Sequence, residues 1–416
     1  MALLLIGMSV IMLATLAGGW LARKVGQPRV VGEIVGGILL GPSLFGRFAP
    51  NVSSALFPKS SFAVFEIFST VGLILFLFLV GMELDHELLY RQRRTALLAS
   101  GMSILLPFAI GALLAPSLRV RFAPQGVGGT PFTLFLGIAM SITAFPVLAR
   151  ILEERGIQAT ELGVTAIFCA AVDDLFAWLF LSLALALIGA PGGPSSLLSR
   201  LSGLAAYLIV MLGVIRPLAA RWTRNLQNVE LSFEMLSIVL ALTLTSAAAT
   251  EFIRVHPLFG AFIAGTCFPR VENWQKTMRE HLDTLVSVIL LPLFFALTGM
   301  RTQLSLLYGK SALLWAATVL LAAVFGKLAG AALAARWNGH SWRYAAALGA
   351  LLNTRGLVEL VVLNIAYNVG VFSPTLFSMM VVMALLTTMS TAPILNLLGV
   401  EDHSLIKPLP ADRPVM

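Results

Sequence analysis

Long apolar stretches separated by short polar segments repeat along the whole chain. Thirteen of them lie at roughly residues 2–22, 28–45, 62–84, 94–115, 132–153, 160–189, 199–221, 233–250, 257–270, 280–300, 311–336, 342–370 and 373–399. A helix of about 20 apolar residues is long enough to cross the hydrocarbon core of a bilayer. The pattern therefore predicts an all-α polytopic membrane protein with about 13 transmembrane helices.

The order of these spans predicts an internal repeat. Thirteen spans divide into six, one linker and six, and because the two halves are offset by an odd number of spans, the second half is inverted in the membrane. In this scheme the span at 132–153 corresponds to the span at 342–370, and both are interrupted, at Pro146 and at Gly356. Matching interruptions in the two halves are the best indication of a substrate site that sequence provides.

Both interruptions carry chemistry that can serve an ion. Pro146 lacks an N–H group and frees carbonyls about one turn upstream, and Gly356 weakens the other helix. Freed carbonyls and half-helix ends become ligands and partial charges where they line a cavity. Thr143 and Thr354 place hydroxyls beside the breaks. For either break alone, a simple kink in a membrane helix is an equally good interpretation.

Composition and charge agree with a membrane protein. Hydrophobic residues make up 58 % of the chain, charged residues 12 %, and the mean hydropathy is +0.91, which excludes an ordinary soluble domain. The net charge of +8 does not indicate nucleic-acid binding, because the basic residues lie in short loops. Seventeen of them fall on one side of the predicted spans and eight on the other, which favours an outside N-terminus and a cytoplasmic C-terminus.

The domain organisation is simple. Residues 1–400 are expected to form one membrane domain, with core helices at about 94–189 and 311–399 and the remaining helices as a panel, and 401–416 a short tail. The first span is followed, and not preceded, by basic residues, so we expect it to be retained. Cys169 and Cys267 are single and far apart, so no disulfide, resident metal or cofactor is predicted.

Two adjacent aspartates, Asp173 and Asp174, lie near the middle of the sixth span. A carboxylate at the bilayer centre costs about 3 kcal/mol on insertion scales, so each needs a counter-charge, a proton or a cation. Neighbours on a helix point about 100° apart, which favours separate roles over a dyad sharing one proton. Lys327 is the only lysine inside a predicted span and can pair with one of them. The other is then able to exchange a proton for a cation, although a purely structural ion pair is the alternative.

Arg355 and Glu359 lie four residues apart, next to the second break, and therefore share a helix face. We expect them to pair and to neutralise the half-helix ends there, since the pattern favours a structural role over direct ion binding. Asn353 precedes them in the same break.

The chain resembles the monovalent cation/proton antiporter 2 family, closest in its motifs to plant-type cation/proton exchangers and their bacterial relatives. The matching segments are GQPRVVGE at 26–33, GP at 41–42, FLVGME at 78–83, ITAFPVLAR at 142–150, AVDD at 171–174, FGAFIAG at 259–265, LFFALTGM at 293–300, NTRGLVE at 353–359 and PTLF at 374–377. They follow the family order over nearly the whole chain.

The resemblance implies a six-helix core that moves against a panel of dimerisation helices, with the two broken helices crossing in the core. It implies that Asp174 matches the essential ion-binding aspartate and that Asp173 matches the aspartate paired with the core lysine, here Lys327. It further implies a homodimer in a bacterial inner membrane that serves pH and cation homeostasis.

The function expected is therefore exchange of Na⁺ or K⁺ for H⁺ by alternating access. A cation channel or uncoupled carrier of the same fold is the alternative, distinguished by its inability to drive uphill cation movement. An intramembrane aspartyl protease would need its aspartates on different helices, so the adjacency of Asp173 and Asp174 argues against an enzyme. The choice between Na⁺ and K⁺ and the stoichiometry stay open, because selectivity depends on details of cavity size and carbonyl field strength.

Overall fold

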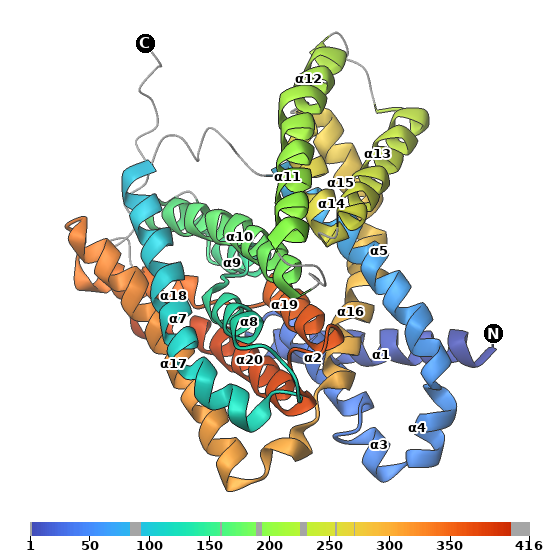
Figure 1. Cartoon of the computed structure of the whole chain (residues 1–416), viewed down its shortest axis with the longest axis vertical. Coiled ribbons are helices and arrows are strands. Elements are labelled where there is room, and N and C mark those ends of the chain that lie inside the picture. Colours follow the sequence, from blue (N-terminus) through green and yellow to red (C-terminus); the bar gives the residue numbers. More distant parts are fainter. Residues whose placement is uncertain are drawn as a thin grey trace. The chain divides into compact units, whose positions relative to one another are not determined.

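The structure is a computed structural model that describes residues 2–83, 93–158, 160–188, 194–224, 231–253, 256–269 and 271–400, and all its regular elements in these ranges are helices (Figure 1). The α-helices are α1 (Ala2–Lys24), α2 (Arg29–Leu40), α3 (Phe45–Phe48), α4 (Pro50–Leu56), α5 (Lys59–Glu83), α7 (Arg93–Phe122), α8 (Gly129–Ser141), α9 (Phe145–Glu154), α10 (Glu161–Ile188), α11 (Pro194–Val210), α12 (Arg216–Arg224), α13 (Phe233–Phe252), α14 (Pro257–Cys267), α15 (Glu272–Leu285), α16 (Leu291–Arg301), α17 (Lys310–Trp337), α18 (Trp342–Leu352), α19 (Leu357–Asn368) and α20 (Pro374–Leu397). Two π-helical turns, Met211–Ile215 and Val286–Leu290, and one 3₁₀ turn, Leu304–Leu307, complete the set.

The described residues contain ten helices that are long and apolar enough to cross a membrane, or eleven if the bent pair α18 and α19 counts as one span. Two shorter apolar helices, α8 and α14, overlap stretches that the sequence pattern predicts as spans. The predicted all-helical polytopic class is confirmed, whereas the count of 13 stays a prediction. The predicted tail, 401–416, lies outside the described residues.

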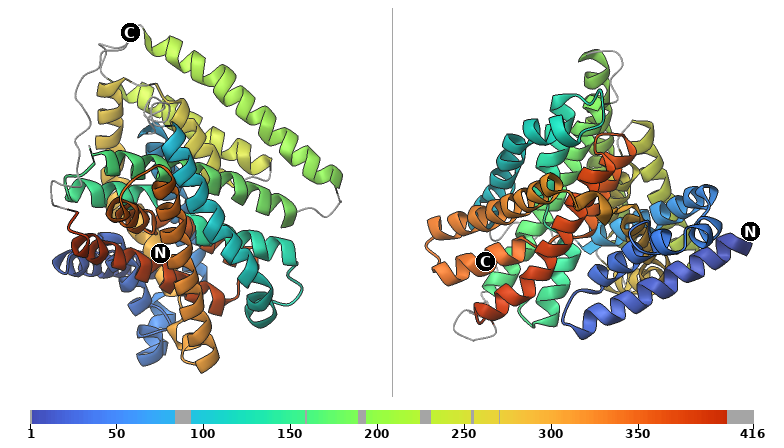
Figure 2. Two further views of the ribbon diagram at one scale, coloured as in Figure 1. Left: turned by 90° about the vertical axis from the view of Figure 1, so that its left-hand side faces the viewer. Right: turned by 90° about the horizontal axis from the view of Figure 1, so that it is seen from below.

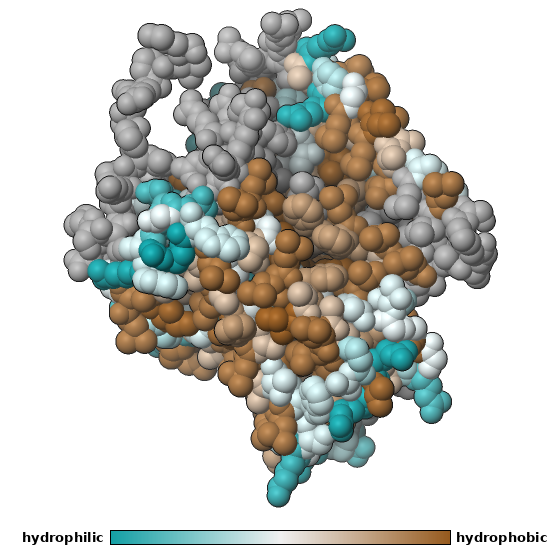
Figure 3. Space-filling model, turned by 60° about the vertical axis from the view of Figure 1, so that its left-hand side comes forward, coloured by the Kyte–Doolittle hydropathy of each residue, from teal (hydrophilic) through white to brown (hydrophobic). Residues whose placement is uncertain are grey.

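Apolar side chains cover much of the visible surface (Figure 3). Among the large ones, Leu113 is 79 % exposed and Phe252 is 87 % exposed. A soluble protein rarely exposes apolar area on this scale, but a bilayer solvates it without cost. The protein is a multi-pass integral membrane protein.

The chain divides into two compact units, and the boundaries between them that lie in the described residues fall inside α1, α3, α10 and α16. The first unit comprises Met1–Thr15, Phe48–Asp85 and Ser182–Leu297. In it α5 packs along α14, and α14 packs on α13. Helices α5 and α14 approach closely because Gly81 has no side chain: a Cβ atom there would lie 2.2 Å from the carbonyl oxygen of Phe262. Tyr207 and Ser246 join α11 to α13 through a 2.6 Å hydrogen bond between their hydroxyls.

The second unit comprises Leu16–Arg47, His86–Leu181 and Thr298–Met416. The most extensive helix packing in this unit is between α7 and α17. Helix α7 also packs on α8, and α17 packs on α18 and α20 (Figure 2). A cluster of fully buried apolar residues, including Leu148, Leu152, Leu348 and Leu352, fills the space around the broken helices. This unit holds all the candidate site residues.

Candidate functional site

The first broken helix ends at Ser141 and begins again at Phe145. Between them the backbone is extended, with φ −70° and ψ 137° at Ile142. Pro146 is the second residue of α9, a first-turn position where a missing N–H group removes no helical hydrogen bond. The proline therefore lies in the first turn of the second half-helix, and the break lies just before that turn.

The second broken helix ends at Leu352 and begins again at Leu357, with a bend of 46° between the halves. Gly356 is the residue before the second half. A Cβ atom on it would lie 2.7 Å from Cγ2 of Val147 and 3.1 Å from Cβ of Ala144, which belong to the first broken helix. The absence of a side chain at Gly356 lets the two breaks approach this closely.

The two breaks are joined by direct hydrogen bonds. The backbone N–H of Ala144 donates to the carbonyl of Thr354 at 2.9 Å. The Thr143 hydroxyl lies 2.9 Å from the carbonyl oxygen of Leu352, the last residue of α18. Each break therefore satisfies backbone groups that the other leaves without a helical partner. The predicted crossing of two discontinuous helices is confirmed.

Arg355, in the second break, binds the end of the first half-helix α8. Its two terminal nitrogens each donate to a carbonyl at 2.6 Å, one to Ala139 and one to Met140. The carbonyl end of a helix carries about half a negative charge, so the buried guanidinium compensates it. Glu359 lies 3.4 Å from Nη1 of Arg355, as an ion pair without hydrogen-bond geometry.

Two threonines of α20 hold the second break from the other side. Thr388 accepts from the backbone N–H of Arg355 at 3.0 Å, and its own hydroxyl lies 2.7 Å from the Arg355 carbonyl. The hydroxyls of Thr354 and Thr391 are 3.3 Å apart. These bonds replace those that an unbroken helix would have made.

Asp173, on α10, accepts from a complete set of donors. Lys327 Nζ lies 2.9 Å from Oδ2, and the Thr143 hydroxyl lies 2.6 Å from the same oxygen. Ser100 donates to Oδ1 at 2.9 Å, and Ser103 lies 3.4 Å from Oδ2. Lys327 also donates to the Thr143 oxygen at 2.8 Å. A buried ion pair needs such extra donors to offset its loss of hydration.

Asp174 is in a different environment although it is the next residue. Its side chain is buried, with the residue 3 % exposed, and its Oδ1 has no hydrogen-bond partner among the described residues. The difference follows from helix geometry, since successive side chains diverge by about 100°. Asp173 faces Ser100 and Lys327, and Asp174 does not share those contacts.

The charges of this region do not cancel. Three buried carboxylates, of Asp173, Asp174 and Glu359, accompany two buried cations, of Lys327 and Arg355. With all five ionised, these described side chains carry one negative charge more than positive. Since an isolated buried charge is costly, the region requires one bound proton or one bound cation.

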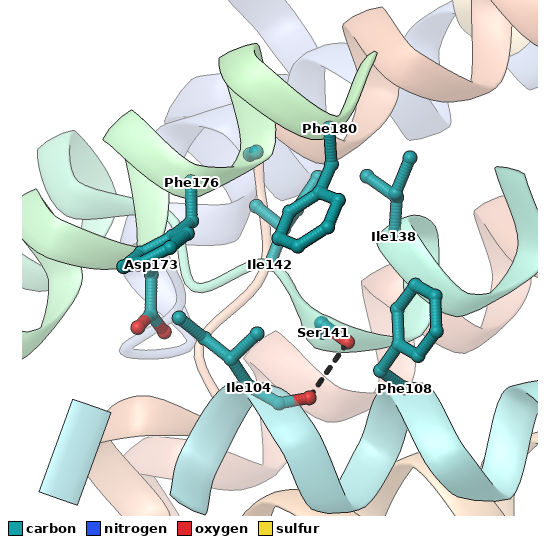
Figure 4. A pocket seen from close by; sticks show the side chains of 9 residues that line it. Ile104, Phe108, Ile138, Ser141, Ile142, Asp173, Phe176 and Phe180 are labelled. Carbon is teal, nitrogen blue, oxygen red and sulfur yellow. Dashed lines mark hydrogen bonds between the residues drawn. The ribbon is translucent and has the colours of Figure 1, made fainter. Parts of the chain in front are cut away.

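A small pocket borders Asp173 (Figure 4). Its void is about 10 Å³, roughly the room needed for one water molecule. Ile104 and Phe108 of α7, Ser141 of α8 and Phe180 of α10 line it, with Asp173 at one end. Most of the lining is apolar, so the pocket leaves little room for water beside Asp173.

The structure brings most of the predicted site residues together. Asp173, Lys327 and Thr143 form one hydrogen-bonded group, and Thr354 and Arg355 lie in the crossing. Asn353 is buried there as well. Of Pro146 only the backbone is described.

The sequence analysis missed the hydroxyls that support this group, namely Ser100, Ser103, Thr388 and Thr391. In both pairs the residues are three apart in an apolar helix and so share one face. That spacing is the signal that could have found them.

The fold and this site define an integral membrane protein built on two crossed, discontinuous helices, an arrangement found in secondary transporters. The chain belongs to the sodium/hydrogen exchanger transmembrane family, whose pattern it matches over residues 11–397.

Several proteins are similar to it along most of its length. The Na⁺/H⁺ antiporter NhaS4 of Synechocystis sp. is 39 % identical over 400 residues, which cover 94 % of this chain and 96 % of that protein. The cation/H⁺ antiporter 17 of Arabidopsis thaliana is 38 % identical over 407 residues, covering 97 % of this chain and 49 % of the plant protein. The K⁺/H⁺ antiporter 1 of Saccharomyces cerevisiae is 32 % identical over 386 residues, covering 91 % and 44 %. The chain thus spans about half the length of the plant and yeast relatives.

Among solved structures, the sodium proton antiporter MjNhaP1 from Methanocaldococcus jannaschii is similar with a TM-score of 0.67 and 18 % identity. The match covers 95 % of this chain and 97 % of that one. At this identity the likeness shows the fold alone.

Proposed function

We propose that this chain is a secondary active transporter that exchanges Na⁺ or K⁺ for H⁺, and that Asp174 binds the cation and the proton in turn. The observation that carries the proposal is the unbalanced negative charge of the crossing, together with Oδ1 of Asp174, which has no hydrogen-bond partner in the part of the chain that the structure describes. One proton or one alkali cation satisfies that charge, and the two compete for the same carboxylate.

This competition couples the two fluxes. With Asp174 empty and ionised, the core would carry an uncompensated carboxylate through the low-dielectric region, at a cost of about 3 kcal/mol. A barrier higher by that amount slows the movement about 150-fold. The core therefore moves mainly with a proton or a cation bound, and exchange dominates over leak.

The other site residues support Asp174 in this proposal. Lys327 neutralises the carboxylate of Asp173 in an ion pair, and the neighbouring hydroxyls support that pair, so Asp174 is left to bind the ion. The remaining site residues hold the two breaks in place and supply half-helix ends. They are Thr143, Pro146, Asn353, Thr354, Arg355 and Glu359.

The names of the relatives support antiport. The Synechocystis protein, which this chain matches over nearly its full length, is named a Na⁺/H⁺ antiporter, and the yeast protein a K⁺/H⁺ antiporter. These two names differ in the cation, so both ions stay in the proposal. A transporter of this kind works without catalysing a covalent step.

The architecture follows in the same proposal. Core helices at about 94–189 and 311–399 carry the site by alternating access, and the remaining helices form a panel through which two copies associate as a homodimer. The protein lies in a bacterial inner membrane, with the N-terminus outside and the C-terminal tail in the cytoplasm, as the basic loop residues favour.

The test is Asp174→Asn in proteoliposomes loaded with a pH-sensitive dye, with Na⁺, K⁺ and Li⁺ added in turn. We expect cation-dependent proton movement to disappear while the protein elutes normally on size exclusion. Asp283→Asn is the matched control, since that aspartate is exposed on α15 and should keep full exchange.

Wild-type exchange by the Asp174→Asn protein would remove this residue from the mechanism. A channel gives a different result with the wild-type protein, because an imposed pH gradient would then fail to drive cation movement uphill. That outcome would replace antiport by passive conduction.

A further inference from the structure

The side chain of Asn353 presents an unusual feature of the crossing. The residue is 1 % exposed, and neither Oδ1 nor Nδ2 has a hydrogen-bond partner among the described residues. An amide can accept at its oxygen and donate two hydrogens from its nitrogen. Each buried polar group left without a partner costs about 1–3 kcal/mol, so native proteins rarely tolerate one without a reason.

Backbone contacts on both sides fix Asn353 in the crossing. The carbonyl oxygen of the residue before it, Leu352, lies 2.9 Å from the Thr143 hydroxyl oxygen, and the residue after it, Thr354, accepts from the backbone N–H of Ala144. Its own backbone N–H donates to the Gly349 carbonyl at 3.0 Å as the cap of α18. The amide is therefore held in place without any hydrogen bond of its own.

A second, independent observation concerns the end of α18. The corresponding end of α8 is compensated by a guanidinium, that of Arg355. Among the described contacts, the last carbonyls of α18 have only uncharged neighbours: the Thr143 hydroxyl lies 2.9 Å from the Leu352 carbonyl, and the Thr391 hydroxyl lies 3.4 Å from the Ala350 carbonyl. Since a helix C-terminus carries about half a negative charge, the end of α18 favours a cation. The buried ammonium of Lys327 bonds to the Thr143 oxygen and not to these carbonyls, and the same Thr143 hydroxyl, 2.6 Å from Asp173 and 2.9 Å from the Leu352 carbonyl, brings the aspartate-bearing turn of α10 beside the end of α18.

We infer that Oδ1 of Asn353 is a neutral ligand of the transported alkali cation, which binds at the end of α18 with the Asp174 carboxylate as its charged ligand. This inference rests on the proposed function and names one part of its site. Hard cations take oxygen ligands of this kind, carboxylate and amide carbonyl together. A neutral oxygen adds affinity without adding charge, so the ion can still be released when a proton arrives.

The experiment replaces Asn353 by leucine, which has a similar volume and no polar atom. Without cation, we expect the melting temperature in detergent to stay equal or rise, because two unsatisfied atoms are removed. We expect the stabilisation that added Na⁺ or K⁺ gives the wild-type protein to be lost. In proteoliposomes the KM for the cation should rise at least about tenfold, which corresponds to about 1.4 kcal/mol.

Asn364→Leu is the matched control. Asn364 is also a buried amide, but it accepts from Arg301 at 2.7 Å and donates to Thr298 at 2.9 Å. We expect this variant to lower the melting temperature and to keep the cation-dependent stabilisation. The opposite order of the two variants separates a ligand from a structural amide.

Asn353→Asp supplies the rescue, since it retains an oxygen at the same position and should keep the cation-dependent stabilisation. If the leucine variant does not fold, Asn353→Ala carries the same test. A leucine or alanine variant with wild-type KM and wild-type stabilisation by Na⁺ and K⁺ would overturn the inference and leave the amide as a binder of trapped water. The proposed function would survive that result, because it is tested separately, by transport in the Asp174→Asn variant and by uphill cation movement in the wild-type protein.

Discussion

The buried pair of Lys327 and Asp173 gives the sharpest test of the structure. Both side chains are fully buried, and Nζ lies 2.9 Å from Oδ2. Removing one partner of such a pair commonly costs about 3–5 kcal/mol, whereas replacing both by neutral groups is often nearly neutral. We therefore compare Lys327→Met, Asp173→Asn and the double variant.

The structure limits each cost. After Lys327→Met, Asp173 still accepts from Ser100 at 2.9 Å and from Thr143 at 2.6 Å. The largest possible cost arises if Asp173 has to become protonated. At pH 7 this costs about 4 kcal/mol, calculated from the reference pKa of a free aspartate. With two donors retained we expect about 2–4 kcal/mol.

After Asp173→Asn, Lys327 keeps the Thr143 oxygen at 2.8 Å and the amide oxygen, but no counter-charge among its described hydrogen bonds. Its worst case is loss of the proton, about 5 kcal/mol at pH 7 from the reference pKa of a free lysine. We expect about 3–5 kcal/mol for this variant.

The assay is thermal unfolding of the purified protein in detergent at pH 7. At about 2 °C per kcal/mol, each single variant should melt several degrees lower, and the double variant should recover most of the loss. If the double variant loses as much as the two single variants together, the two side chains are not energetically coupled and the ion pair described here is not the one in the membrane.

Three further results are expected. Gly356→Ala should lower both the melting temperature and transport, because its Cβ would lie 2.7 Å from a side-chain carbon across the crossing, whereas Gly101→Ala, with no atom within 4 Å, should be neutral in melting. Ser100→Ala should cost about 1–3 kcal/mol in melting experiments, and Ser103→Ala less, because the Ser103 hydroxyl is 3.4 Å from the carboxylate and has another acceptor at 3.1 Å. Equal losses in either comparison would contradict the corresponding contact. Burial lowers the pKa of His256 to about 4 from 6.5, so the unfolded chain takes up a proton before the folded one does. Its contribution to stability is complete above about pH 6.5 and falls by about 2 kcal/mol on going to pH 5. His256→Asn should remove that part of the acid sensitivity, and an unchanged pH profile of melting would show that the histidine is hydrated.

Local pattern determined the class of this protein and predicted the position of its candidate site. Whether a segment crosses a membrane depends on about 20 consecutive residues, and a break depends on one proline or glycine, so both can be predicted from sequence. The two aspartates can also be recognised from sequence, because a carboxylate inside an apolar span is costly in any orientation. The total of 13 spans stays a prediction, because composition alone does not show whether short apolar helices such as α8 and α14 cross the membrane.

Only the tertiary structure decided what each polar group contacts. Arg355 donates to carbonyls 216 and 215 positions earlier in the chain, and Asp173 receives Ser100 from 73 positions away. Nor does the sequence indicate that Oδ1 of Asp174 and the amide of Asn353 have no hydrogen-bond partner among the described residues. Such contacts depend on which helix faces meet, because the hydrocarbon region holds no water that could satisfy a polar group in their place.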